Sequence, residues 1–103
     1  MNFEKQIKMI EKGKQIGYCV IKDEVYFECG IQKKKDLLYL VYFSEYNLKY
    51  EFDENGKQEF YSYSNLEDAI AYIISRKFPF DEFKPQKGNK IFDMDHPKFP
   101  NIN

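Results

Sequence analysis

The sequence contains few of the residues on which most enzyme sites are built. It has no tryptophan, one histidine (His96) and two cysteines, Cys19 and Cys29. There is no CxxC or Cys/His cluster of the kind that binds zinc, and no glycine-rich loop that would cradle a phosphate. A Ser-His-Asp or Cys-His arrangement would have to recruit His96, which lies in a proline-rich tail. We therefore expect a non-enzymatic protein with no catalytic residues, cofactor or metal.

The tail also holds the one arrangement that resembles a metal-ligand set. Asp93, Asp95 and His96 lie within four consecutive residues. No second cluster completes a coordination shell, and Pro97 places the segment in an irregular region. An exposed polar tail is the favoured interpretation.

Signals for membrane insertion or export are absent as well. No run approaches the roughly 20 apolar residues that a membrane-spanning helix needs. The first residues, Met-Asn-Phe-Glu-Lys-Gln, lack the apolar segment of a signal peptide. We therefore expect a cytoplasmic protein without a membrane partner. Both cysteines are expected to be buried and reduced. A disulfide between adjacent strands is the alternative.

Charge gives little support to nucleic-acid binding. The net charge is −1, and the one basic cluster is Lys33-Lys34-Lys35. Beside tyrosine-rich strands this cluster could serve single-stranded nucleic acid. However, the charges between the aromatic residues are mostly glutamates, which repel phosphate. A solvated turn that protects a strand end is favoured.

The middle of the chain is rich in aromatic residues that alternate with polar ones. Phe and Tyr account for all of its 18% aromatic content. Alternation with a period of two predicts half-buried strands, and an unbroken apolar run bounded by turns predicts a central strand. The predicted strands are 18–22, 25–32, 37–43, 48–52 and 58–63. The predicted turns are 32–36, 44–47 and 53–56, the last with an Asn-Gly hairpin signal.

Two helices flank these strands. The first is predicted over 2–14, capped by Asn2 and ended by Gly13 or Gly17. The second is predicted over 65–77, with Ser64 as N-cap and Glu67 completing a capping box. Its core-facing stripe is Leu66, Ala69, Ile70, Ile73 and Ile74.

These elements predict an α+β fold. Short turns join antiparallel neighbours, so four to five strands should form a meander sheet, covered on one face by the two helices. Residues 1–78 are expected to form a single domain. Residues 79–103 contain all four prolines and are expected to be irregular and to pack on that domain.

The sheet face that the helices leave uncovered is the candidate binding surface. If Phe27, Leu48, Phe52 and Phe60 point at the helices, the alternating residues point away. Tyrosines supply rigid contact area, and carboxylates steer a basic partner. The alternative is that these tyrosines are ordinary surface residues or are covered by the tail. The outward set comprises Glu24, together with the six predicted partner-binding residues Tyr26, Glu28, Glu51, Glu59, Tyr61 and Tyr63.

The order of these segments resembles a known family. An N-terminal helix leads into Tyr18-Cys19-Val20-Ile21, and a hairpin at 51–57 leads into Phe60-Tyr61-Ser62-Tyr63-Ser64 and a Leu66-Glu67-Asp68-Ala69-Ile70 helix. Over about residues 3–78 this resembles the small immunity proteins of bacterial polymorphic-toxin systems, of the immunity protein 59 type.

The resemblance implies a cytosolic protein that binds and blocks one cognate toxin, with no catalytic residues to carry over. We expect a toxin with a basic surface and a chain that is a monomer or weak dimer. The alternatives are another small intracellular interaction module, such as a phage-encoded inhibitor or regulator, and, less favoured, a binder of single-stranded nucleic acid.

Overall fold

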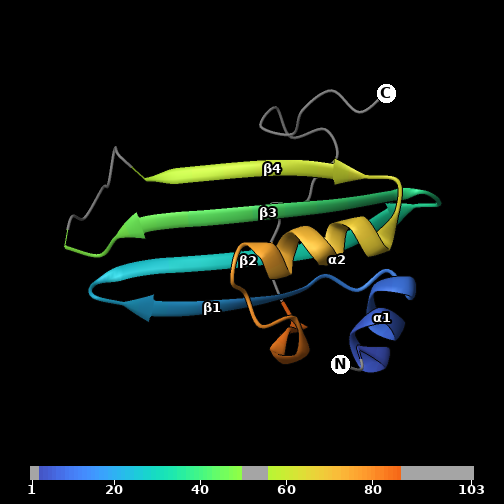
Figure 1. The fold of residues 1–103 in the computed structure, drawn as a ribbon, viewed down its shortest axis with the longest axis horizontal. Coiled ribbons are helices and arrows are strands. Elements are labelled where there is room, and N and C mark those ends of the chain that lie inside the picture. The colour runs from blue at the N-terminus through green and yellow to red at the C-terminus, as the bar shows by residue number, and fades with distance from the viewer. Residues whose placement is uncertain (1–2, 50–55, 87–103) are drawn as a thin grey trace.

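A computed structural model describes residues 3–49 and 56–86. Over these residues the chain forms two α-helices, a short 3-10 helix and one antiparallel sheet with the strand order β4-β3-β2-β1-β5 (Figure 1). The α+β fold predicted from the sequence is therefore confirmed. The elements are α1 (Glu4–Glu11), β1 (Ile16–Lys22), β2 (Val25–Lys35), β3 (Leu38–Asn47), β4 (Lys57–Tyr63), α2 (Leu66–Ser75), η1 (Phe80–Glu82) and β5 (Lys84–Pro85).

Strands β1 to β4 form the predicted meander. The turn between β1 and β2 consists of Asp23 and Glu24, with φ angles of 51° and 66°. Positive φ at both central residues is the geometry of a two-residue hairpin whose twist matches that of its strands. The hairpin pairs Lys22 with Val25 and continues to Ile16 opposite Ile31.

Two predicted turns are wrong because the strands are longer than expected. Strand β3 continues through the predicted turn at 44–47, since Glu45 pairs with Phe27 on one side and with Lys57 on the other. Strand β2 includes the lysine run, with a register shift between Lys33 and Lys35. In both places polar residues extend a strand, because cross-strand pairing outweighs weak local preference. Glu45 pairs on both sides, whereas Lys33 and Lys35 pair with β3 alone. The predicted strand at 48–52 and turn at 53–56 lie mostly outside the described residues.

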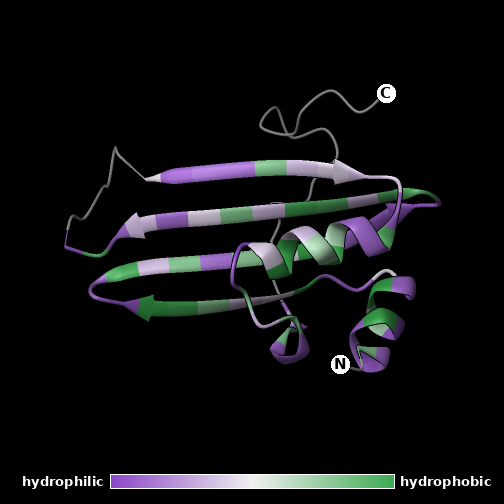
Figure 2. Cartoon of the chain, viewed as in Figure 1, coloured by the Kyte–Doolittle hydropathy of each residue, from purple (hydrophilic) through white to green (hydrophobic). Residues whose placement is uncertain are grey.

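The helices cover one face of the sheet, as predicted; we call it the helix face. Ile10 of α1 and Ile73 of α2 join Ile31 and Val41 of the sheet in one buried cluster. Figure 2 shows hydrophobic residues along the first half of β3 and along α2. This layer holds most of the buried side chains, so it is the main core of the fold.

Both helices end in the same hydrogen-bonded motif. In α1 the N–H groups of Gly13 and Lys14 donate to the carbonyls of Ile10 and Met9 (2.9 and 3.0 Å). Gly13 has a φ of 85°, as expected for a helix that ends in a Schellman motif. The helix was predicted to end at Gly13 or Gly17, and Gly13 is the residue that ends it. The cap predicted at Asn2 lies outside the described residues, and Phe3 occupies the N-cap position.

The start of α2 differs by one residue from the prediction. Asn65, rather than Ser64, is the N-cap, because its side-chain oxygen accepts from the N–H groups of Glu67 and Asp68 (2.8 and 3.3 Å). Asparagine is among the strongest N-caps. The predicted capping box, with Ser64 as the N-cap and Glu67 as its partner, is therefore wrong, because the helix begins one residue later.

The chain after α2 contributes two side chains to the core. Phe80 and Phe83 are buried in the helix-face cluster. Phe80 packs edge-on against Phe3, with ring centroids 5.1 Å apart. Residues of β5 then pair with Ile16 and Gly17 at the edge of β1. The packed part of the chain thus extends beyond residue 78.

The neighbours Ile73 and Ile74 provide a matched test of this core. Ile73 is fully buried, as predicted, but Ile74, which was also predicted to face the core, is 44% exposed. We expect Ile73→Ala to lower the free energy of unfolding by about 2–5 kcal/mol, because it leaves a cavity. We expect Ile74→Ala to change it by less than about 0.5 kcal/mol. Chemical denaturation measures both, and equal losses would mean that α2 faces the sheet differently.

Candidate functional site

The register of the sheet divides the predicted binding residues between two faces. Residues directly opposite one another on neighbouring strands share a face. Tyr61 lies opposite Val41, which is buried under the helices. Glu59 and Tyr63 have the same parity as Tyr61 and therefore also lie on the helix face. The prediction that these three point away from the helices is wrong.

Tyr26 and Glu28 do point away from the helices, as predicted. They lie opposite Tyr46 and Ser44 of β3, whose neighbours in the strand, Glu45 and Phe43, are on the helix face. We call this opposite side of the sheet the second face. Glu51 lies outside the described residues.

The prediction for Phe60 is wrong in the opposite direction. It was expected to point at the helices, but it packs on the second face beside Leu40 and Tyr42. Strand β4 has an aromatic residue on each face, because Phe60 and Tyr61 are neighbours in the strand. Alternation therefore could not decide which parity faces the core, and a shift of one residue exchanges the two faces.

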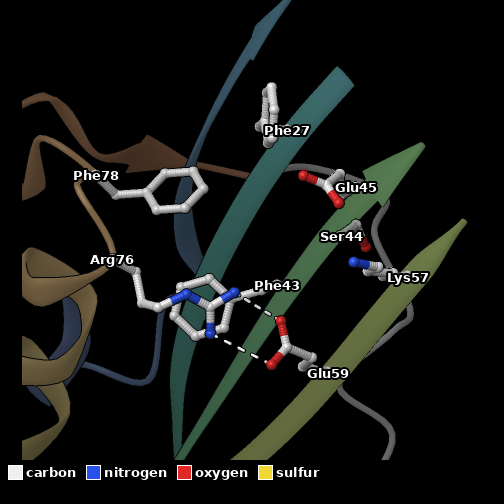
Figure 3. A pocket seen from close by; sticks show the side chains of 8 residues that line it. All are labelled: Phe27, Phe43, Ser44, Glu45, Lys57, Glu59, Arg76 and Phe78. Atoms are coloured by element: carbon white, nitrogen blue, oxygen red, sulfur yellow. Dashed lines mark hydrogen bonds and ion pairs between the residues drawn. The ribbon is translucent and has the colours of Figure 1, made fainter. Parts of the chain in front are cut away.

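On the helix face, Glu59 is the centre of a hydrogen-bonded network with Arg76. Arg76 lies just after α2, and its Nη2 and Nη1 donate to Glu59 Oε2 and Oε1 (2.6 and 3.3 Å; Figure 3). The Tyr61 hydroxyl donates to Glu59 Oε1 (2.6 Å), and Arg76 Nη1 also donates to the Tyr72 hydroxyl (3.0 Å). The guanidinium carbon of Arg76 lies 4.2 Å from the centroid of the Phe43 ring. A two-point ion pair stacked on a ring holds Arg76 in one orientation.

This network determines the protonation of its members. The Arg76 guanidinium, and then the Tyr61 hydroxyl, lower the pKa of the Glu59 carboxyl. In turn, the hydrogen bond to Glu59 raises the pKa of Arg76. Both carboxylate oxygens are already hydrogen-bonded, and the carboxyl is a weaker base than an ordinary one. The geometry therefore suits a role in tying β4 to α2 better than a role in proton transfer.

A cavity of about 340 Å³ opens beside this network. Figure 3 shows Phe78, from the segment after α2, and Phe27, from β2, on either side of the space next to Arg76. Among the described residues, no group of three or more His, Cys, Asp or Glu side chains could hold a metal ion. The residues that line the cavity are Phe27, Phe43, Ser44, Glu45, Lys57, Glu59, Arg76 and Phe78.

The second face presents an exposed row of large side chains across three strands. Ile21 of β1 lies opposite Tyr26 of β2, which lies opposite Tyr46 of β3. The two tyrosine rings are stacked, with centroids 4.8 Å apart. Ile21 is 60% exposed and Tyr46 is 40% exposed. We call Ile21, Tyr26 and Tyr46 the exposed row.

A more polar row lies next to it on the same face. Cys19, Glu28 and Ser44 are opposite one another across the same three strands. Glu28 accepts a hydrogen bond from the side-chain nitrogen of Gln86 (3.2 Å). Burial, and then the charge of Glu28, raise the pKa of the Tyr26 phenol.

The two cysteines lie on different faces. Cys29 is buried on the helix face, as predicted, and burial raises the pKa of its thiol well above the ordinary value. Cys19 is exposed, which corrects the prediction that both are buried. Both are free thiols. Because neighbouring positions of a strand point to opposite faces, this pair cannot form a disulfide across β1 and β2.

Beyond the exposed row, the second face carries a buried apolar cluster. Leu38, Leu40 and Tyr42 are each at most 4% exposed. The Tyr42 ring lies against Gly30, where an added Cβ would overlap it. The Tyr42 hydroxyl accepts from Gln86 (3.0 Å). Gly30 therefore provides the close approach that lets a tyrosine lie flat on β2.

Sequence reasoning missed three residues of these sites. Tyr46 was assigned to a turn, although its place two residues after Ser44 continues the parity of β3. Ile21 was assigned to a strand without a face. Nothing in the sequence singles out Arg76: its partner Glu59 is 17 residues earlier, and no local pattern joins them.

Neither α1 nor α2 has the length and apolar composition needed to cross a membrane. A comparison of the sequence with protein-family models, with curated proteins and with solved structures finds no match.

The ion pair predicts a pH-dependent contribution to stability. A carboxyl whose pKa is lowered by folding stabilises the fold above its unfolded pKa, about 4.3 for Glu, and this is lost as the pH falls through the lowered value. We expect Glu59→Gln to reduce the free energy of unfolding by about 1 kcal/mol at pH 7, since the pair is partly exposed.

The difference between wild type and Glu59→Gln should shrink as the pH falls from 7 to 2. Urea unfolding at several pH values measures it. Glu4→Gln is a matched control, because Glu4 forms an exposed pair with Lys8 within one helix (3.3 Å) and should matter less. A Glu59→Gln effect that stays constant with pH would contradict the lowered pKa.

Proposed function

We propose that this chain is a non-enzymatic binding protein that holds one partner protein on the second face of its sheet. We further propose that the partner is a bacterial toxin, which the chain neutralises. The exposed row is the observation that carries the first part. The resemblance to small immunity proteins is what supports the second.

The chemistry of the exposed row favours a protein partner. Interface energy concentrates in a few aromatic and aliphatic anchors. Tyr26 and Tyr46 already stack on each other, so little side-chain freedom would be lost on binding. Leu48, just after β3, is another large apolar side chain that is 46% exposed. Adjoining large side chains such as those of the exposed row are typical of an interaction site.

Charge around the row favours a partner with a basic surface. Glu28 lies next to Tyr26 on the same face. Glu24 lies in the adjoining turn and is paired with Lys49 (3.5 Å). Carboxylates at a rim mainly accelerate association. Glu59 is no longer part of this set, because it is paired with Arg76 on the helix face. The steering charge is therefore smaller than the sequence suggested.

The test is direct titration against the product of the gene adjacent to the one that encodes this chain. We expect Tyr46→Ala to raise the Kd about 30-fold, as for an aromatic anchor worth about 2 kcal/mol. Ile21→Ala should raise it about tenfold. Circular dichroism confirms that each variant is folded, and rescue of growth in cells that express the gene product reports neutralisation.

Ile74→Ala is the matched control for Ile21→Ala. Both are exposed isoleucines, at 44% and 60%, but Ile74 lies on α2, on the other side of the molecule. It should bind as wild type does. If Ile21→Ala and Tyr46→Ala also bind as wild type, the second face is not the site. If the gene product does not bind and is not toxic, toxin neutralisation is excluded for this pair, and another interaction partner replaces it.

A further inference from the structure

A second cavity on the helix face has a composition of its own. It has a volume of about 380 Å³ and adjoins the cavity beside Glu59, since Phe27, Arg76 and Phe78 line both. Its walls are aromatic: Phe27 comes from β2, and Phe78 packs edge-on against Tyr18 of β1, with centroids 6.4 Å apart. Cavities of this size with mostly apolar walls suit small molecules. We call this cavity the lysine groove, after Lys22 and Lys77 in its lining.

Its charges are all of one sign. Lys22, Arg76 and Lys77 are the charged residues of its lining, and no carboxylate is among them. Arg76 is neutralised by Glu59, on the side of the neighbouring cavity. Both lysines are exposed, and no ion pair within residues 3–49 and 56–86 involves either of them. The lysine groove thus presents two cations beside aromatic walls.

The backbone at Lys77 is a second, independent observation. Lys77 has a φ of 71°. It occupies in α2 the place that Gly13 occupies in α1, because the N–H groups of Lys77 and Phe78 donate to Ile74 and Ile73 (2.9 and 3.4 Å). This position favours glycine, and a lysine there is strained. Strain of this kind is concentrated at functional sites. Lys77 therefore places a side chain after α2 at the position where α1 is followed by Gly13.

We propose that the lysine groove binds a small planar aromatic anion, with its ring between Phe27 and Phe78 and its carboxylate at Lys22 and Lys77. Aromatic rings pack edge-on or offset against the walls. The lysines supply charge-assisted hydrogen bonds to the carboxylate at the mouth of the groove. This site lies on the opposite side of the sheet from the exposed row and does not depend on the proposed partner protein.

The test uses two probes that differ only in charge. 2-Naphthoate and 2-naphthalenemethanol are added to the full 103-residue chain, and the amide signals are followed by NMR. We expect naphthoate to shift signals at residues 20–27 and 76–79 and to bind at least tenfold more tightly than the neutral alcohol.

Variants then separate the charge from the fold. The double variant Lys22→Gln/Lys77→Gly should bind naphthoate about tenfold more weakly than wild type. The same Lys77→Gly change alone should raise the unfolding midpoint, because glycine relieves the strained backbone. Weaker binding therefore cannot result from unfolding. Lys14→Gln, at another exposed lysine next to a helix end, should leave binding unchanged, as should Ile21→Ala on the second face.

Several outcomes would overturn the proposal. One is that naphthoate causes no shifts, or causes shifts only at residues away from 20–27 and 76–79. Equal affinity for the alcohol would exclude a site for anions. An unchanged affinity in the double variant would show that the two lysines do not hold the carboxylate.

Discussion

The fold depends on the double burial of β3. Val41 and Tyr42 are neighbours in this strand, point to opposite faces and are both fully buried. Strand β3 also pairs along most of its length with β2 on one side and β4 on the other. A one-residue slip against either neighbour would exchange core and surface residues throughout the sheet. The register of β3 therefore decides which side chains reach each face and, with them, both candidate sites.

Features with a local cause could be predicted from the sequence. The apolar run at 37–43 indicated a central strand, and the alternation of Val25, Phe27, Cys29 and Ile31 assigned β2 to the correct face. Gly13 marked the end of α1 because a single residue type suits its backbone angle. The stripe that contains Ile70 and Ile73 oriented α2 toward the sheet.

Features that depend on pairing between distant residues could not be predicted. Strand β4 has aromatic residues at both parities, so only its pairing with β3 shows that Tyr61, and not Phe60, lies under α2. The last residues of β2 and β3 are mostly polar and resemble turns. Both strands were therefore predicted too short, and Tyr46 was placed in a turn. The ion pair between Glu59 and Arg76 joins a strand to the end of a helix. Glu59, which was predicted to bind a partner, is therefore a structural residue.

The two faces consequently offer different chemistry. The second face has an exposed row that runs across three strands, with two stacked tyrosine rings and a carboxylate beside it. The helix face has a groove with aromatic walls, lined also by two lysines. A protein partner on one face and a small anion on the other would be independent, because the sheet separates them.

The orientation of β4 is the measurement that tests this account most directly. Nuclear Overhauser spectra with labelled tyrosine and phenylalanine rings would report it. The account predicts contacts between the rings of Tyr61 and Tyr72, whose centroids are 5.1 Å apart, and between Phe60 and the cluster of Leu38, Leu40 and Tyr42. Contacts from Phe60 to α2, with Tyr61 on the second face, would contradict it and would reverse the assignment of Glu59.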